Sequence, residues 1–173
     1  MDLTFRLNGV GLRADMSETP SINVNTKKKL ARLAAVQALY QISYEQQSAT
    51  QTIQDYIDNN FISLRDDLGA GDIELASPDA ELFGLLVDGV MKNQQEIDEM
   101  LAGAFSSKVS GDRMEVLLRM IMRAGVYELY HHSEVSVGII INDYVDVARA
   151  FFNAKEPGLV NAVLDKLAKT LRS

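Results

Sequence analysis

The sequence predicts an all-α fold, and three observations support that prediction. Apolar residues recur three and four positions apart over most of the chain, which is the period of an amphipathic helix. Helix start signals precede several of these stretches, and the strongest are Ser77-Pro78-Asp79 and Glu156-Pro157. No strand pattern competes, although residues 135–141 are rich in β-branched side chains.

The first half of the chain is expected to hold three helices and one loop. Asn25, Thr26 and Thr50 are residue types whose side chains accept a backbone N–H at a helix start. Two glycines and several acids in residues 64–76 favour a loop. The expected elements are a helix from Asn25 or Thr26 through Ile42, a helix from Thr50 to Phe61, the loop over residues 64–76, and a helix from Ser77 to about Phe105.

The second half is expected to hold three more helices. Ser110-Gly111-Asp112 interrupts the helical pattern and restarts it, and Ser136 is suited to cap a helix. The expected helices run from Met114 to His131, from Ser136 to Phe151 and from Glu156 to Leu171. The pattern therefore predicts a protein of about six or seven helices.

Composition restricts the class of protein. With 173 residues, 47% of them apolar, the chain is long enough for one domain with a sizeable core. Cysteine is absent, which excludes disulfides, thiolate metal sites and cysteine nucleophiles. No run of 18 apolar residues is present, so no segment is expected to span a membrane. A cytoplasmic location fits these features, and a sequence pI near 4.8 argues against unspecific coating of nucleic acid.

Patterns typical of an enzyme are weak. Glu128 and His131 have the spacing of a carboxylate–histidine metal pair, but such a site needs a second pair, and the only other histidine is His132. Gly9-x-Gly11 does not lie between a clear strand and a helix, which argues against a dinucleotide loop. We therefore expect no catalytic residue, no metal site and no cofactor.

One basic cluster stands out in a chain whose formal net charge is −7. Lys27, Lys28, Lys29 and Arg32 lie at the start of the first predicted helix, and no acid interrupts them. Cations in the first turn oppose the helix dipole, at a cost of roughly 0.3–1 kcal/mol each, and they also repel one another. A polyanion removes both costs, so the cluster indicates contact with nucleic acid. The alternative, in which the lysines only solubilise the helix, remains open.

Three segments together resemble the NusB family. They are KKLARLAAVQALYQ from Lys28, MRAGVYELYHHSEVSVGIIINDYVDVARAFF from Met122 and LVNAVLDKLAK from Leu159. The segments occur in the family's order with plausible spacing, and the resemblance covers roughly Lys27 to Arg172. Chance similarity between amphipathic helices is not expected to reproduce the shared polar positions, which are Arg123, Tyr127-Glu128, Asn142, Asn161 and Asp165-Lys166.

The resemblance implies two packed helical lobes and a noncatalytic transcription factor. Proteins like this bind the boxA element of nascent RNA together with NusE, a small-subunit ribosomal protein. The pair helps to load an antitermination complex onto RNA polymerase, chiefly on ribosomal RNA operons. We therefore expect boxA RNA and NusE as direct partners and RNA polymerase as an indirect one. A homodimer is compatible with the family, in which some members are monomers and others are dimers.

The resemblance also assigns residues to each partner. The implied RNA-binding residues are Lys27, Lys28, Lys29, Arg32 and Lys155. The implied protein-binding residues are Tyr40 and Leu118. Lys27 extends the family's basic run, and Lys155 adds a charge where the family often has an acid.

The chain departs from the family's pattern in the parts that bear on RNA binding. Lysines replace arginines in the basic cluster, which weakens bidentate recognition of phosphate. Ser136 stands where the family has a proline. Gly158-Leu159 replaces a Lys-Phe pair whose ring is available for base stacking. We therefore expect a weaker C-terminal half of the RNA surface and RNA binding that depends more on the protein partner.

Other polar residues of the shared segments have structural interpretations. Arg123 is interpreted as a buried, paired arginine, Tyr127 and Glu128 as core and cap residues, and Asn142 and Asn161 as polar links between helices. Two other functions remain as alternatives. One is a helical protein-interaction module without RNA binding, and the other is a stand-alone relative of the N-terminal domain of ribosomal RNA methyltransferases.

Residues 1–25 lie outside the resemblance and are expected to form an N-terminal extension before a helical RNA-binding domain over residues 26–173. Their glycines and scattered polar residues cannot offset an ordering entropy of about 1–2 kcal/mol per residue. The segment also has alternating apolar residues that could dock on an exposed groove, namely Leu3, Phe5, Leu7, Val10 and Leu12. We expect a chain that starts at Met16 to keep its melting temperature and its binding to both partners.

Overall fold

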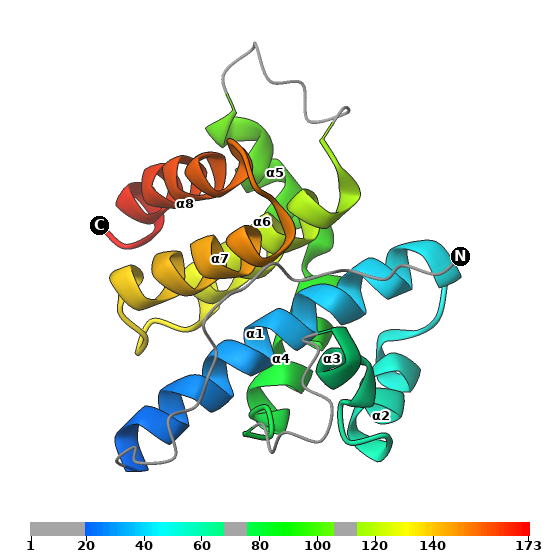
Figure 1. Ribbon diagram of the computed structural model, residues 1–173. Coiled ribbons are helices and arrows are strands. Elements are labelled where there is room, and N and C mark those ends of the chain that lie inside the picture. Colours follow the sequence, from blue (N-terminus) through cyan, green and yellow to red (C-terminus); the bar gives the residue numbers. More distant parts are fainter. Residues whose placement is uncertain (1–19, 68–75, 106–113) are drawn as a thin grey trace.

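The structure, a computed structural model, describes residues 20–67, 76–105 and 114–173 (Figure 1). Over these residues the chain forms eight α-helices and no strand. The helices are α1 (Pro20–Glu45), α2 (Ala49–Asp58), α3 (Ile62–Asp67), α4 (Ala80–Lys92), α5 (Gln94–Ala104), α6 (Val116–His131), α7 (Val137–Phe151) and α8 (Glu156–Leu171). The all-α prediction is confirmed, with more helices than the six or seven expected.

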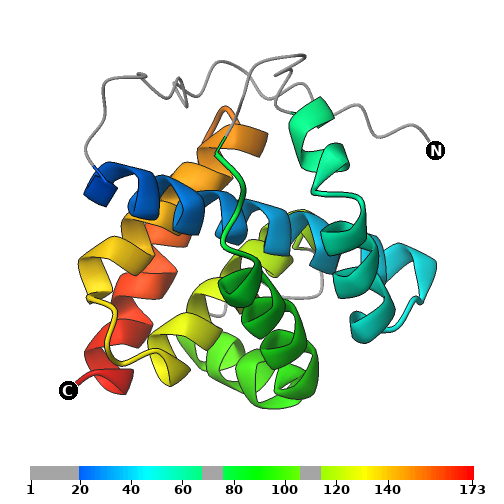
Figure 2. The ribbon, with the colours of Figure 1, turned by 90° about the horizontal axis from the view of Figure 1, so that it is seen from below.

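Helix α1 crosses the molecule and joins its two lobes (Figures 1 and 2). It packs against α2 and α4 of the first lobe and against α6 and α7 of the second. Figure 2 shows α2 and α3 toward one end of α1, and α7 with α8 toward the other. Helices α6, α7 and α8 pack on one another, and α5 covers α6 and α8. The N-terminal part of α1 is therefore the part that lies against α7.

Helix α1 begins at Pro20, so the start predicted at Asn25 or Thr26 was too late. Proline is favoured at the first helical position because its missing N–H has no partner to lose there and its φ angle suits a helix. The aliphatic side chains from Leu30 to Ile42 are buried, as the periodic pattern predicts, and Tyr40 is half-buried. The predictions for residues 1–19 lie outside the described part of the chain.

Two features of the next segment differ from the prediction. Ser48, rather than Thr50, caps α2, and its Oγ accepts the N–H of Gln51 at 3.2 Å. Helix α3 begins just before the segment expected to be a loop and occupies its first four residues, 64–67. Phe61 and Leu64 anchor it because they are 4% and 3% exposed. Burial of these two side chains against the core stabilises a helix here, and this effect outweighs the loop preference predicted from the glycines and acids of the segment.

The single helix expected after Ser77 is two helices in the structure. Asp79 caps α4, and its Oδ1 accepts the N–H of Leu82 at 3.0 Å. At the other end of α4, the side chain of Asn93 donates to the carbonyl of Gly89 at 2.7 Å. The backbone N–H of Asn93 donates to the same carbonyl at 3.1 Å, so Asn93 closes α4 with two bonds and the chain continues from it as α5.

The three helices expected in the second half are confirmed, with ends close to the predicted ones. Ser136 caps α7, because its Oγ accepts the N–H of Ile139 at 3.4 Å. Helix α8 starts at Glu156, with Pro157 in its first turn. Among the described helices, none combines the length and the apolar content that crossing a membrane requires.

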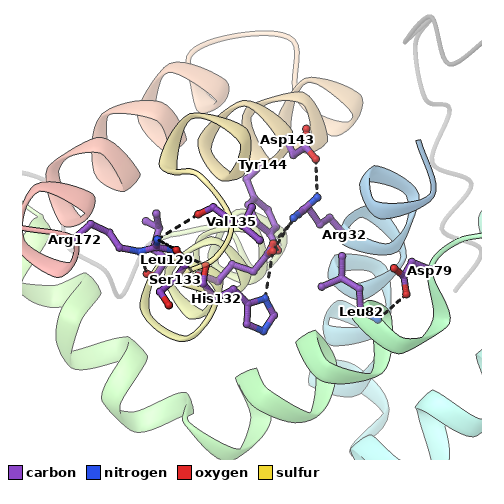
Figure 3. A network of polar contacts seen from close by, with 11 residues as sticks. Arg32, Asp79, Leu82, Leu129, His132, Ser133, Val135, Asp143, Tyr144 and Arg172 are labelled. Carbon is purple, nitrogen blue, oxygen red and sulfur yellow. Dashed lines mark hydrogen bonds and ion pairs between the residues drawn. The ribbon is translucent and has the colours of Figure 1, made fainter. Parts of the chain in front are cut away.

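Arg172 fastens the end of α8 to the end of α6 (Figure 3). Its guanidinium donates to the backbone carbonyls of Glu128, Leu129, His132, Ser133 and Val135. The last carbonyls of a helix lack partners within the helix, and a cation near them is favoured by the helix dipole. One side chain therefore satisfies the end of α6 and the turn that leads into α7.

Candidate nucleic-acid interface

A groove of about 580 Å³ lies between the start of α1 and the outer face of α7. Helix α1 contributes Lys28, Lys29 and Arg32 to its lining. Helix α7 contributes Asn142, Asp143, Asp146 and Arg149. The predicted basic cluster therefore faces a second set of polar side chains from a helix more than a hundred residues later in the chain.

Arg32 lines this groove but is only 1% exposed. Its Nε and Nη2 donate to the two carboxylate oxygens of Glu128, each at 2.7 Å. Its Nη1 donates to Asp143 at 2.8 Å. Figure 3 shows the guanidinium pointing from α1 toward Asp143 and Tyr144 of α7. The structure therefore commits the guanidinium of Arg32 to two carboxylates of the protein itself, which leaves it little surface for RNA.

Glu128 lies at the centre of this network and is fully buried. Its Oε2 also accepts the hydroxyl of Tyr144 at 2.7 Å, and Nδ1 of His132 lies 3.5 Å from its Oε1. Burial alone would raise the pKa of Glu128, but the polar contacts with His132, Arg32 and Tyr144 lower it to about 2. The carboxylate is therefore ionised at neutral pH despite its burial.

Burial also shifts the pKa values of the other members of the network. The pKa of Asp143 is raised because burial outweighs the attraction of Arg32 and Lys29. Burial and the negative charge of Glu128 raise the pKa of Tyr144 well above its ordinary value, so its hydroxyl remains a donor. Burial would lower the pKa of Arg32, but its hydrogen bonds and attraction to Glu128 raise it. The network therefore ties α1 to α6 and α7 with fixed charges.

A second, more exposed cluster of ion pairs lies in the same groove. Nζ of Lys29 lies 2.7 Å from Oδ2 of Asp146 and 3.7 Å from Oδ1 of Asp143. Nη1 of Arg149 lies 3.0 Å from Oδ1 of Asp146. The side chains of Lys29, Asp146 and Arg149 are 31%, 32% and 64% exposed. Asp146 therefore bridges a cation from α1 and a cation from its own helix at the protein surface.

Lys27 and Lys28 have a different environment from the other two cations of the cluster. Lys27 is exposed and Lys28 is half-buried. Within the described ranges, neither lysine takes part in an ion pair or a side-chain hydrogen bond. Lys28 also lines a second hollow of about 250 Å³ between α1, α4 and the end of α6. Carboxylates of Asp79, Glu81 and Glu134 line that hollow too. Among the described residues, two of the four predicted cations thus form no ion pair, whereas Lys29 and Arg32 are paired with carboxylates.

The remaining predicted site residues lie elsewhere. Lys155 is exposed at the start of α8 and does not line the groove. Tyr40 is half-buried, with its ring centroid 4.8 Å from that of Tyr44, and its pKa is raised to about 12, chiefly by a hydrogen bond with Tyr44. Leu118 is 6% exposed and belongs to the core, so it offers a partner little area.

The structural interpretation of Arg123 is confirmed, since it is 8% exposed and donates to Asp98 from Nε at 2.8 Å and from Nη2 at 2.7 Å. Tyr127 is a core residue as expected, but Glu128 is an interior partner of Arg32 and not a cap. His131 is exposed and stacks on Tyr127 at 4.6 Å, so it does not form a pair with the buried Glu128.

Asn142 and Asn161 were interpreted as polar links between helices. Both side chains are exposed, on α7 and α8 respectively, and neither forms such a link within the part of the chain that the structure describes. The interpretation is therefore wrong for the described contacts.

Sequence reasoning did not select the charged residues of α7. Asp143, Asp146 and Arg149 follow one another at intervals of three, which places them along one face of a helix. That spacing was the available signal, but it does not reveal that the face lies against the start of α1. Asn142, which also lines the groove, was noted only as a possible helix link.

Comparison with known proteins relates most of this chain to one family. The sequence model of the NusB family matches residues 29–169. "Transcription antitermination protein NusB" of Bartonella quintana (strain Toulouse) is 37% identical over 159 residues, which are 92% of this chain and 99% of that protein. The protein of the same name from Rhodospirillum rubrum is 36% identical over 157 residues, 84% of this chain and 85% of that protein.

The fold is also similar to a solved structure. A structure of T. maritima NusB matches with a TM-score of 0.61, covering 82% of this chain and 89% of that chain. The two sequences are 22% identical, so this likeness concerns the fold alone.

Proposed function

Because this chain belongs to the NusB family, we propose that it is a transcription antitermination factor that binds boxA RNA of nascent transcripts together with the ribosomal protein NusE. The name shared by its relatives supports the process, and the basic start of α1 supports RNA as a direct partner. On this proposal the protein acts in the cytoplasm and reaches RNA polymerase through the antitermination complex. It contributes binding surfaces and performs no catalysis.

The observation that carries the proposal is the pair of lysines beside the polar groove that form no ion pair among the described residues. Lys27 and Lys28 lie in the N-terminal part of α1, where their charge has no ion-pair partner among the described residues. The phosphates of a nucleic acid supply the missing negative charge, since phosphate contacts from lysine fix a strand in place without reading its sequence. The groove next to Lys28 offers the amide of Asn142, which can both donate to and accept from a base edge.

The remaining predicted RNA residues take different parts in this proposal. Lys29 is close enough to the surface to reach a phosphate, but only in competition with Asp146. Arg32 supports the interface indirectly, because its buried bonds to Glu128 and Asp143 hold α1 against α6 and α7. Lys155 lies outside the groove and serves as a peripheral charge for a longer RNA.

The experiment that tests RNA binding replaces Lys27 and Lys28 by glutamine. Lys27→Gln with Lys28→Gln should weaken binding of a boxA RNA strongly and flatten the slope of log affinity against log salt by about 1.4, or about 0.7 per single-strand phosphate contact. The matched control is Lys92→Gln with Lys169→Gln, which removes the same charge from exposed i,i+4 pairs on α4 and α8. Equal affinity and slope in the Lys27/Lys28 variant and the unmodified protein would refute the assignment.

A second experiment tests the protein partner. Tyr40→Ala should weaken the complex with NusE by roughly 1–3 kcal/mol if the half-buried ring anchors the interface. Tyr130→Ala is the matched control, since Tyr130 is 46% exposed at the end of α6. A large loss of melting temperature with normal affinity for NusE would assign Tyr40 to the core instead.

Gel shifts with boxA RNA, carried out with and without NusE, separate this proposal from its main alternative. A helical protein-interaction module would bind NusE and leave the RNA unshifted in both cases. We expect a shift that strengthens when NusE is added, because the chain lacks the Lys-Phe pair at Gly158-Leu159.

A further inference from the structure

We propose that Lys29 and Arg149 form a phosphate subsite for single-stranded RNA, and that Asp146 is the carboxylate that an RNA phosphate displaces from it. The inference rests on the proposed RNA binding and adds a residue that limits its affinity. Asp146 acts on this proposal as an internal counter-ion, which holds the two cations in place and competes with the ligand for them.

The geometry of Asp146 is that of an anion seated in a two-cation site. One of its oxygens, Oδ2, lies 2.7 Å from Nζ of Lys29, and the other, Oδ1, lies 3.0 Å from Nη1 of Arg149. The cations come from α1 and α7, which form the two walls of the groove. Carboxylate and phosphate oxygens accept hydrogen bonds from the same ammonium and guanidinium donors at similar distances. A site that holds this carboxylate is therefore also suited to a phosphate.

Exposure decides which of the two clusters in the groove can exchange its anion. The side chains of Lys29, Asp146 and Arg149 are each about one-third exposed or more, and ion pairs of this kind are weak because water screens them. Arg32 and Glu128 are 2% and 0% exposed, so a strand of RNA cannot reach their bond. Of the two clusters that the structure describes in the groove, the one around Asp146 is thus both weak and accessible.

Asp143 keeps Lys29 in place when Asp146 leaves. Asp143 lies 3.7 Å from Nζ of Lys29 and is itself held by Arg32 at 2.8 Å. Lys28, next to Lys29 in sequence, lines the same groove and has no ion pair of its own among the described residues. A strand that contacts Lys28 is therefore led along the groove toward Lys29 and Arg149.

The direct test is Asp146→Asn, which keeps the shape of the side chain and removes its charge. Affinity for a boxA RNA should rise about two- to fivefold, the range expected when a weak surface ion pair no longer competes. The salt slope should steepen by about 0.7, because no displaced carboxylate then takes up a salt cation. The matched control is Asp165→Asn on α8, which makes the same change in net charge and releases Lys169 from a pair at 2.9 Å.

Arg149→Ala, measured in both backgrounds, tests whether Asp146 and Arg149 compete at one site. The loss of RNA affinity should be larger in the Asp146→Asn protein, where Arg149 is released, than in the unmodified protein. Equal losses in the two backgrounds would overturn the proposal, since they would show that Asp146 does not limit Arg149. Equal gains from Asp146→Asn and Asp165→Asn would also overturn it, because net charge alone would then account for the effect.

The outcomes separate this inference from the proposed function. If the unmodified protein binds the RNA and the Lys27/Lys28 variant loses it, but Asp146→Asn changes nothing, the subsite is wrong and the RNA function stands. If neither the unmodified protein nor Asp146→Asn binds the RNA, with or without NusE, both proposals fail.

Discussion

Two clusters of ion pairs lie side by side at the junction of α1 and α7, and they differ in burial. The inner cluster joins Arg32, Glu128 and Asp143, and the Arg32 and Glu128 side chains are 2% and 0% exposed. The outer cluster joins Lys29, Asp146 and Arg149, whose side chains are 31%, 32% and 64% exposed. Both clusters contain the same kinds of charged side chain, but the ion pairs of the outer cluster are weaker because water screens them.

The difference teaches that a count of charges in a sequence is not a count of charges available to a ligand. Lys28 and Arg32 are one helical turn apart on α1 and so project from a similar face of the helix. Arg32 nevertheless lies inside the protein, because α6 supplies Glu128 at that level, whereas Lys28 opens onto two hollows. The inner cluster stabilises the fold, and the outer one is suited to exchange partners with a ligand.

The largest effect is expected where the inner cluster is broken. Arg32→Met should lower the free energy of unfolding by about 3–5 kcal/mol, because it leaves the ionised Glu128 buried without its main partner. Urea unfolding followed by circular dichroism measures this loss. Adding Glu128→Gln should restore part of it, since the unpaired charge is then gone. If Arg32→Met alone is as stable as the unmodified protein, the inner cluster does not hold the helices together.

The next largest effect is expected at low pH, where Glu128 becomes protonated. The pKa of Glu128 is about 2 in the folded protein, below its ordinary value of 4.5, so its stabilising contribution is present above pH 4.5 and is lost as the pH falls toward 2. A depression of this kind contributes on the order of 2 kcal/mol. The stability gap between the unmodified protein and Glu128→Gln, measured by urea unfolding at several pH values, should therefore narrow over this interval. A gap that stays constant contradicts the assignment.

Asp143 provides an internal check on that measurement. Its pKa is raised, so its carboxylate acts in the opposite sense, and its contribution to stability falls as the pH rises through its titration. The gap between the unmodified protein and Asp143→Asn should accordingly change with pH in the opposite direction from the gap for Glu128→Gln.

Arg123 provides an intermediate case between the two clusters. Its side chain is 10% exposed, but that of its partner Asp98 is 41% exposed, and the pair links α6 to α5. Arg123→Ala should cost about 1–2 kcal/mol, because two charge-assisted bonds are lost but Asp98 can turn to water. Thermal unfolding should place this variant between Arg32→Met and variants of the outer cluster. A loss as large as that of Arg32→Met would mean that burying only one partner of an ion pair makes its removal as costly as burying both.

The smallest effect on stability is expected in the outer cluster. Arg149→Ala should change the free energy of unfolding by no more than about 0.5 kcal/mol, because its pair with Asp146 is largely solvated. Lys92→Ala, which removes an i,i+4 partner of Asp88 on α4, serves as the control. A loss of several kcal/mol from Arg149→Ala would show that the two clusters do not differ as described.

The sequence predicted the helices better than it predicted the two clusters of ion pairs. Apolar periodicity and caps such as Ser136 are local, so α6, α7 and α8 were found with nearly correct ends. Helix α3 was missed because its stability comes from packing of Phe61 and Leu64 against other helices, which local composition does not reveal.

The site was predicted in part for the same reason. The basic start of α1 was visible as a run of charges, but the burial of Arg32 depends on Glu128, which is 96 residues away in sequence. The bridge by Asp146 likewise depends on α7 packing against α1, and Lys29 and Asp146 are 117 residues apart. Such partners are set by the tertiary fold, so a single sequence could assign the charges but not their availability.

The bonds from Arg172 have a consequence for how the molecule opens. The guanidinium holds the carbonyl of Glu128, whose side chain in turn holds Arg32 and Tyr144. Four helices, α1, α6, α7 and α8, are thereby linked through one residue of α6. Amide hydrogens in these helices should exchange with solvent through a shared, cooperative opening, because releasing one link exposes the others. The end of α8 thus bears on the exchange rates at the start of α1, although the two segments lie at opposite ends of the described chain.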